Sequence, residues 1–115
     1  MRIDLDRQKG SPSVVRPVGS VDVDTASMLR DTLRQMAEEG AESVIVDLGE
    51  VEFIDSSGLS ALVSGLKALR SKGGMLSLTR PHPQALTALR LTMLDRVFPI
   101  FPTIEEAVKQ GPSLP

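Results

Sequence analysis

The short run Asp55-Ser56-Ser57-Gly58 carries the residue types best suited to chemistry in this chain. It follows the apolar stretch 44–48 and stands where a helical pattern begins. A hydroxyl at a helix start lies beside backbone N–H groups that have no partner within the helix. These groups and the helix dipole favour negative charge, so a phosphate added there would be tolerated. Because nothing nearby in the sequence supplies the machinery to add it, the run predicts a switch rather than an active centre.

A second interpretation of the same run is purely structural. Asp and Ser are ordinary N-cap residues, and many such strings are only a loop entering a helix. On that interpretation the Ser56 hydroxyl caps the helix and does nothing more. Local chemistry alone leaves both interpretations open.

Other catalytic and metal-binding chemistry finds little support. The single histidine, His82, stands between two prolines and is expected to face solvent. One imidazole in a chain without cysteine cannot build a typical zinc site, and disulfides and thiolate chemistry are excluded as well. A hydrolase using Ser56 or Ser57 would need His82 from a distant loop and lacks the Gly-x-Ser-x-Gly elbow. Hydrolysis is therefore disfavoured.

Four acids lie close together around the candidate site. Asp47, Glu50, Glu52 and Asp55 fall within nine positions of one another, on and after the apolar stretch. Acids in a turn are more often solvated than joined around a cation. We therefore expect solvent-exposed carboxylates here and no metal site.

Strand and helix patterns alternate along the chain, which predicts a single α/β layer structure with helices packed on a sheet. Pro17 suits a strand that is an edge or is about to end. One amphipathic stripe of small and apolar residues predicts a helix ended by Gly40. The strands are expected at 3–6, 14–18, 44–48, 75–79 and 97–101, and the helices at about 25–39, 58–72, from 83 and 103–110.

Composition restricts the class of protein further. At 115 residues with 41% hydrophobic residues, the chain is long enough for one globular domain. We expect that domain to span 1–115, with its core at about 13–109 and a frayed tail at 110–115. The formal charge is −2, and no basic cluster supports direct nucleic-acid binding or a membrane surface. Neither a signal peptide nor an apolar run of about 20 residues is evident, so a cytoplasmic protein without membrane insertion is expected.

Several motifs together resemble those of one family. The strand 44–48 followed by Phe-Ile-Asp-Ser-Ser-Gly-Leu at 53–59 matches the most specific motif of the STAS domain (sulphate transporter and anti-sigma factor antagonist). Gly19-Ser20-Val21-Asp22 lies where that family usually has Gly-Glu-Leu-Asp. The resemblance runs from about Val14 to Val108 and is greatest to the free-standing bacterial anti-sigma factor antagonists. Its later landmarks are Gly73-Gly74, Pro83 and Leu94-Asp95-Arg96-Val97-Phe98.

The resemblance implies a fold and a role. The fold is a small mixed, mostly parallel sheet with about four helices packed against it. The phosphoacceptor is Ser56, modified by a partner serine kinase that is also the anti-sigma factor. Asp22, Asp55, Ser57 and Gly58 belong to the partner-binding surface. The unphosphorylated antagonist binds the anti-sigma factor, phosphorylation releases it, and a phosphatase restores it.

The resemblance also implies that the chain is not an enzyme and needs no cofactor or metal. A homodimer is compatible with the sequence. Ser20 replaces the family's usual Glu and removes a charge from the expected partner face. A side chain at Gly58 would stand against the approaching kinase, so we expect Gly58→Val to impair partner binding more than folding. Two alternatives are a STAS subunit of a stress-signalling or lipid-transport complex, and a STAS domain that binds a small ligand or nucleotide.

Overall fold

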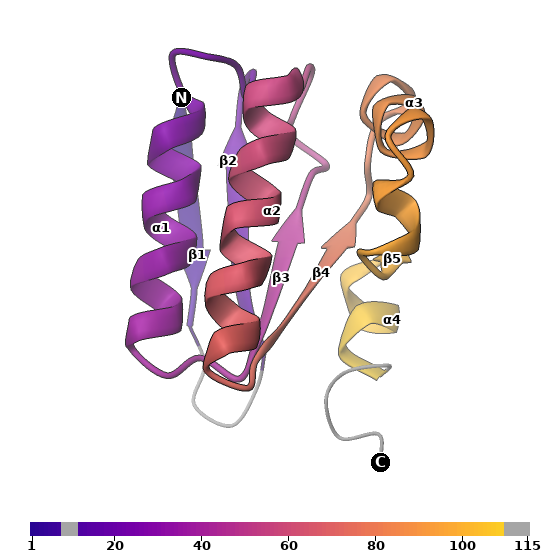
Figure 1. Cartoon of the computed structure of the whole chain (residues 1–115). Helices are drawn as coiled ribbons and strands as arrows, with labels where there is room; N and C mark the ends of the chain where they lie inside the picture. The colour runs from indigo at the N-terminus through magenta and orange to yellow at the C-terminus, as the bar shows by residue number, and fades with distance from the viewer. Residues whose placement is uncertain (8–11, 110–115) are drawn as a thin grey trace.

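A mixed sheet of five strands with helices on its two faces forms the protein (Figure 1). The computed structural model describes residues 1–7 and 12–109, so the tail expected at 110–115 lies outside the described residues. The strands lie in the order β1-β2-β3-β4-β5; β1 is antiparallel to β2, and every other pair is parallel. In chain order the elements are β1 (Arg2–Asp6), β2 (Ser13–Val18), α1 (Ala26–Glu38), β3 (Ser43–Asp47), α2 (Ser56–Ser71), β4 (Met75–Thr79), α3 (Pro83–Leu91), the 3-10 helix η1 (Leu94–Arg96), β5 (Ile100–Phe101) and α4 (Ile104–Lys109).

The central strand β3 is buried on both faces, as its continuous apolar run predicts. Val44 and Val46 point toward α1 and α2, which lie side by side across one face of the sheet (Figure 1). Ile45 points the other way and packs with Val14 and with Ala107 of α4. The predicted mixed, mostly parallel sheet with four α-helices in the described part of the chain is therefore confirmed.

Helix α1 follows its sequence pattern closely. The expected inward stripe is buried throughout, at Ala26, Leu29, Leu33, Met36 and Ala37. Gly40 has φ +83°, its N–H donates to the Ala37 carbonyl, and the N–H of Ala41 donates to Met36. These two bonds form a Schellman ending, which needs the left-handed conformation that glycine adopts without strain.

Pro17 lies one residue before the end of β2, which is one of the two positions expected for it. β2 is the second strand of the sheet, but its pairing with β3 stops at Val15, and Pro17 faces only Ile3 of β1. Its missing N–H is therefore harmless. The last strand was expected at 97–101 but is restricted to β5. Residues 97–99 are not part of a strand; they follow η1, which is entered through Met93 at φ 61°, and the Phe98 side chain is buried.

No helix among residues 1–7 and 12–109 has both the length and the apolar character needed to cross a bilayer. The longest, α2, has 16 residues and carries polar side chains along its exposed face.

Candidate functional site

Ser56 is the first residue of α2 and its side chain is exposed. Asp55 precedes it in an extended conformation and caps the helix: its Oδ1 accepts from the N–H of Ser57 at 2.9 Å and of Gly58 at 3.1 Å. Within the described part of the chain, no hydrogen bond engages the Ser56 hydroxyl. The interpretation of Ser56 as the helix cap is therefore wrong, because Asp55 already performs that task.

The loop that follows β2 is bound to the residues before α2. Val21 forms a parallel bridge with Ile54: its N–H donates to the Phe53 carbonyl at 2.8 Å, and its carbonyl accepts from Asp55 at 3.1 Å. This bridge places Asp22 beside Asp55, the N-cap residue of α2, which is far from it along the sequence. The structure thus brings together Asp22, Asp55 and Ser56, which the sequence motifs had grouped.

Local hydrogen bonds order the Asp22 turn. The Asp22 N–H donates to the hydroxyl of Thr25 at 2.9 Å, and that hydroxyl donates to the Ser20 carbonyl at 2.8 Å. The Asp22 carboxylate accepts from the N–H of Asp24 at 3.0 Å. Thr25 therefore holds the turn that carries Asp22 rather than capping α1 with its side chain. A Thr three residues after Asp22 is a sequence signal for such a turn.

Gly58 is buried, so the reason given for the Gly58→Val prediction, a side chain facing the kinase, is wrong. A Cβ at this position would stand 2.5 Å from Ile54 Cγ1 and 2.7 Å from the Val21 carbonyl oxygen. A side chain would therefore press on the backbone of the Val21 bridge instead of reaching toward a partner. The absence of a side chain at Gly58 allows α2 and the Val21 loop to lie close together, and Ser57 beside it is half-buried.

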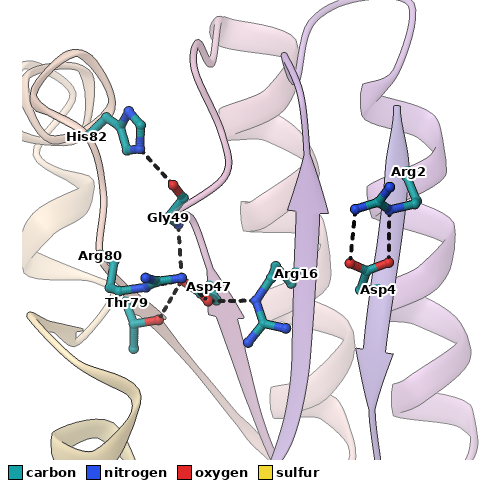
Figure 2. Close-up of polar contacts among 8 residues, drawn as sticks. All are labelled: Arg2, Asp4, Arg16, Asp47, Gly49, Thr79, Arg80 and His82. Carbon is teal, nitrogen blue, oxygen red and sulfur yellow. Dashed lines mark hydrogen bonds and ion pairs between the residues drawn. The ribbon is translucent and has the colours of Figure 1, made fainter.

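The first turn of α3 holds the other side of the β3–α2 loop. Gln84 makes two hydrogen bonds with Ile54: its Oε1 accepts from the N–H at 3.0 Å, and its Nε2 donates to the carbonyl at 2.8 Å. His82 Nε2 lies 2.8 Å from the Gly49 carbonyl oxygen (Figure 2). Because a carbonyl only accepts, that nitrogen carries the proton. His82 is half-buried and bound to the loop, so the expectation that it faces solvent was wrong.

Asp47, at the end of β3, also differs from its expected place. Its side chain is wholly buried, with 0% exposed, whereas Glu50 and Glu52 are exposed and Asp55 is half-buried. Arg16 and Arg80 converge on the carboxylate (Figure 2), with Arg16 Nε at 2.9 Å and Arg80 Nη2 at 2.8 Å from Oδ2. Burial acts to raise the pKa of Asp47, but the hydrogen bonds from Arg80 and Arg16 outweigh it and lower the pKa to about 2.

The acids do not form a metal site. Among residues 1–7 and 12–109, no three His, Asp or Glu side chains lie close enough together to hold a metal ion. Near Ser56 the half-buried acids Asp22 and Asp55 instead form an acidic surface, and Asp24, on the Asp22 turn, is exposed.

Two exposed apolar side chains flank this acidic surface. Val23, next to Asp22, is 74% exposed, and Phe53, two residues before Asp55, is 45% exposed. A hollow of about 320 Å³ lies elsewhere, at the C-terminal end of α2, where Leu66, Arg70 and Met75 contribute to its lining. The length of α2 puts that hollow roughly 20 Å from Ser56. The surface at Ser56 therefore has the features of a contact with a macromolecule more than those of a small-molecule pocket.

Comparison with known proteins gives consistent matches. The family model described as the STAS domain matches residues 2–107. The anti-sigma-B factor antagonist of Bacillus subtilis is 31% identical over 110 residues, covering 95% of this chain and 100% of that protein. The crystal structure of an anti-sigma factor antagonist from Mycobacterium paratuberculosis is similar with a TM-score of 0.85 at 28% identity, covering 95% of this chain and 92% of the other. The phosphorylated form of the Bacillus cell fate determinant SpoIIAA shares the fold, with a TM-score of 0.73 at 22% identity over 95% of this chain and 98% of its own.

Proposed function

Because this chain belongs to the STAS domain family, we propose that it acts as an anti-sigma factor antagonist whose binding is switched at Ser56. In its unphosphorylated form it binds an anti-sigma factor that is also a serine kinase. Phosphorylation of Ser56 by that partner releases it, and a phosphatase restores the binding form. The chain itself supplies the phosphoacceptor and the surface, and the kinase supplies the catalysis.

The observation that carries this proposal is the division of labour between Asp55 and Ser56. Asp55 satisfies the helix start, so the exposed Ser56 hydroxyl stands at the first helical position without a structural task. A hydroxyl needed for capping would resist modification, because its loss would weaken the helix. Ser56 carries no such restriction.

The charges around Ser56 support a release mechanism. A phosphate adds about −1.5 to −2 charges at neutral pH. The N–H groups of Ser57 and Gly58, which would otherwise receive it, already donate to Asp55. The phosphate would therefore lie beside Asp22 and Asp55 on an acidic surface. Carrying that charge into a partner interface without a new counter-charge is unfavourable, so the phosphorylated form should dissociate.

The partner surface is proposed to combine acids with apolar contacts. Asp22 and Asp55 would face basic groups of the anti-sigma factor, while Val23 and Phe53 would supply buried apolar area at the same contact. Ser20, which replaces the usual Glu, is half-buried and gives only its carbonyl to Thr25. The partner of this chain is then expected to have one fewer basic group opposite this position.

Mapping of the phosphate tests the proposal. The full chain is incubated with ATP and a GHKL-type anti-sigma factor kinase from the same organism, and the product is analysed by peptide mass spectrometry. We expect one phosphate, on Ser56. Ser57→Ala is the matched control and should remain a substrate, whereas Ser56→Ala should not. A phosphate on Ser57 or on Ser60, one turn along α2, would contradict the assignment.

A further inference from the structure

The segment Phe53–Asp55 lies between two different hydrogen-bonding partners. In an extended segment, successive backbone groups point to opposite edges. Phe53 and Asp55 use one edge, where they bond to Val21, while the N–H and carbonyl of Ile54 point to the other. Among the residues that the structure describes, no strand lies on that second edge. The amide of Gln84 takes its place and supplies both an acceptor and a donor to Ile54.

This arrangement makes Gln84 important for the loop although it does not touch Ser56. Ile54 is 1% exposed, whereas Gln84 lies at the surface. If the amide is removed, the Ile54 N–H and carbonyl are left to water, which can bond to them but does not tie the segment to α3. His82 binds the same loop at its other end, through the Gly49 carbonyl. Both residues stand on the first turn of α3, which Pro83 begins and which Ala85 and Leu89 anchor in the core. The first turn of α3 thus holds the β3–α2 loop at two points.

We propose that Gln84 is a positioning residue for the phosphoacceptor: the two hydrogen bonds between Gln84 and Ile54, here called the Gln84 clasp, fix the segment that presents Ser56 to the kinase. The inference rests on the proposed function and adds a residue that the motif around Ser56 does not contain. The clasp holds Ile54, Ile54 precedes the cap Asp55, and Asp55 sets the first turn of α2. Without the clasp, the kinase would have to order this segment during binding, which lowers the efficiency of phosphorylation.

Two variants test the clasp. Gln84→Ala removes both bonds. Gln84→Glu keeps the length of the side chain and an acceptor for the Ile54 N–H, but it presents a carboxylate to the Ile54 carbonyl and so loses the donor. Gln35→Ala is the matched control, because the Gln35 side chain on α1 donates to the exposed side chain of Glu39, which follows the helix.

The first readout is amide hydrogen exchange of the isolated chain. We expect Gln84→Ala to lower protection of the Ile54, Ser57 and Gly58 amides by about tenfold or more, while the β3 amides keep theirs. Gln84→Glu should lower it less, and Gln35→Ala not at all. Unchanged protection at Ile54 would overturn the inference. So would an equal loss across the sheet, because that pattern indicates general destabilisation.

The second readout is phosphorylation by the same anti-sigma factor kinase, well below the melting temperature of each variant. We expect kcat/KM for Gln84→Ala to fall by about tenfold, with Gln84→Glu between it and the parent chain. Equal kcat/KM for all variants would overturn the positioning role even if exchange changed. If the parent chain itself accepts no phosphate, the proposed function fails instead, and hydrogen exchange still decides whether the clasp holds the segment.

Discussion

Asp47 and Asp55 stand at the two ends of one loop, yet they do different work. Asp47 ends β3 with its side chain wholly buried between Arg16 and Arg80. Asp55 begins α2 with its side chain half-buried, and the partners of its carboxylate are two backbone N–H groups. One carboxylate is neutralised inside the fold, and the other leaves negative charge at the surface beside Ser56.

The difference follows from how each residue enters the loop. Asp47 shares a face of the sheet with Ile45, so its carboxylate points inward and requires cationic partners. Asp55 is the N-cap residue of α2, so its carboxylate turns toward the free N–H groups of the first helical turn. The loop between them is therefore anchored by charge at one end and by backbone hydrogen bonds at the other, where the switch is proposed.

The largest effect on stability is expected from Asp47→Asn. This variant leaves two guanidinium groups without their counter-charge and should lower the free energy of unfolding by about 3 kcal/mol. That value lies at the low end for broken buried pairs, because the arginine side chains are 33% and 45% exposed. Urea unfolding measures it. Asp4→Asn removes the exposed pair with Arg2 (Figure 2) and should change stability by less than about 0.5 kcal/mol. Equal effects of the two variants would remove the distinction between the buried anchor and a surface charge.

Gly58→Val comes next, at the Asp55 end of the loop. The new side chain would overlap Ile54 and the Val21 carbonyl, and we expect a loss of about 2 kcal/mol in the free energy of unfolding. Ser60→Val, on the exposed face of the same helix, should stay within about 0.5 kcal/mol of the parent chain. Thermal melting of both variants provides the comparison. A fully stable Gly58→Val with weakened partner binding would mean that Gly58 contacts the partner after all.

The stability that Asp47 contributes should depend on pH. The pKa of Asp47 is about 2 in the folded protein against 3.8 as its ordinary value. A lowered folded-state pKa stabilises the fold above the ordinary pKa, and this contribution is lost as pH falls toward the folded-state value. The parent chain should therefore lose about 2 kcal/mol through Asp47 between roughly pH 5 and pH 2. The free energy of unfolding, measured by urea unfolding at several pH values, should fall less steeply toward acid in Asp47→Asn than in the parent chain. Equal slopes of the free energy against pH would contradict the lowered pKa of Asp47.

The smallest of these effects is expected at the cap itself. Asp55→Ala should cost about 1 kcal/mol, whereas Asp55→Asn, which keeps a capping oxygen, should be nearly neutral. Melting temperatures distinguish the two. A loss at Asp55→Asn as large as that at Asp47→Asn would show that charge, and not hydrogen bonding, anchors this end of the loop.

Local patterns in the sequence were enough to place the α-helices and the first four strands, but not η1 or the bounds of β5. The inward stripe of α1, the glycine that ends it and the Asp-Ser-Ser-Gly start of α2 each depend on residues within one or two helical turns. The spacing of apolar residues along an element indicates which of its sides faces the core. The strand–helix alternation then fixed the α/β class before any contact between elements was known.

What the sequence did not show depends on contacts between distant positions. Asp47 meets Arg80 across 33 positions, and Ile54 meets Gln84 across 30. Such pairs depend on the register of β3 against β4 and on the path from β4 into α3. Gly58 was misjudged partly for the same reason, since Val21, distant in the sequence, restricts it together with the nearby Ile54 side chain. A signal for Asp47 did exist: it follows Ile45 by two in a strand buried on both faces.

The central claim is that Ser56 is a switch at a partner interface and not a helix cap. Isothermal titration of Ser56→Asp and Ser56→Ala against the anti-sigma factor tests it most directly, with melting curves as the folding control. Because Asp55 already caps α2, both variants should melt like the parent chain. The Asp form should bind more weakly than the Ala form by roughly 30-fold or more, because it brings an unpaired charge into the contact. Equal affinities, or a loss of about 1 kcal/mol in the stability of Ser56→Ala alone, would contradict the switch and return Ser56 to the role of a cap.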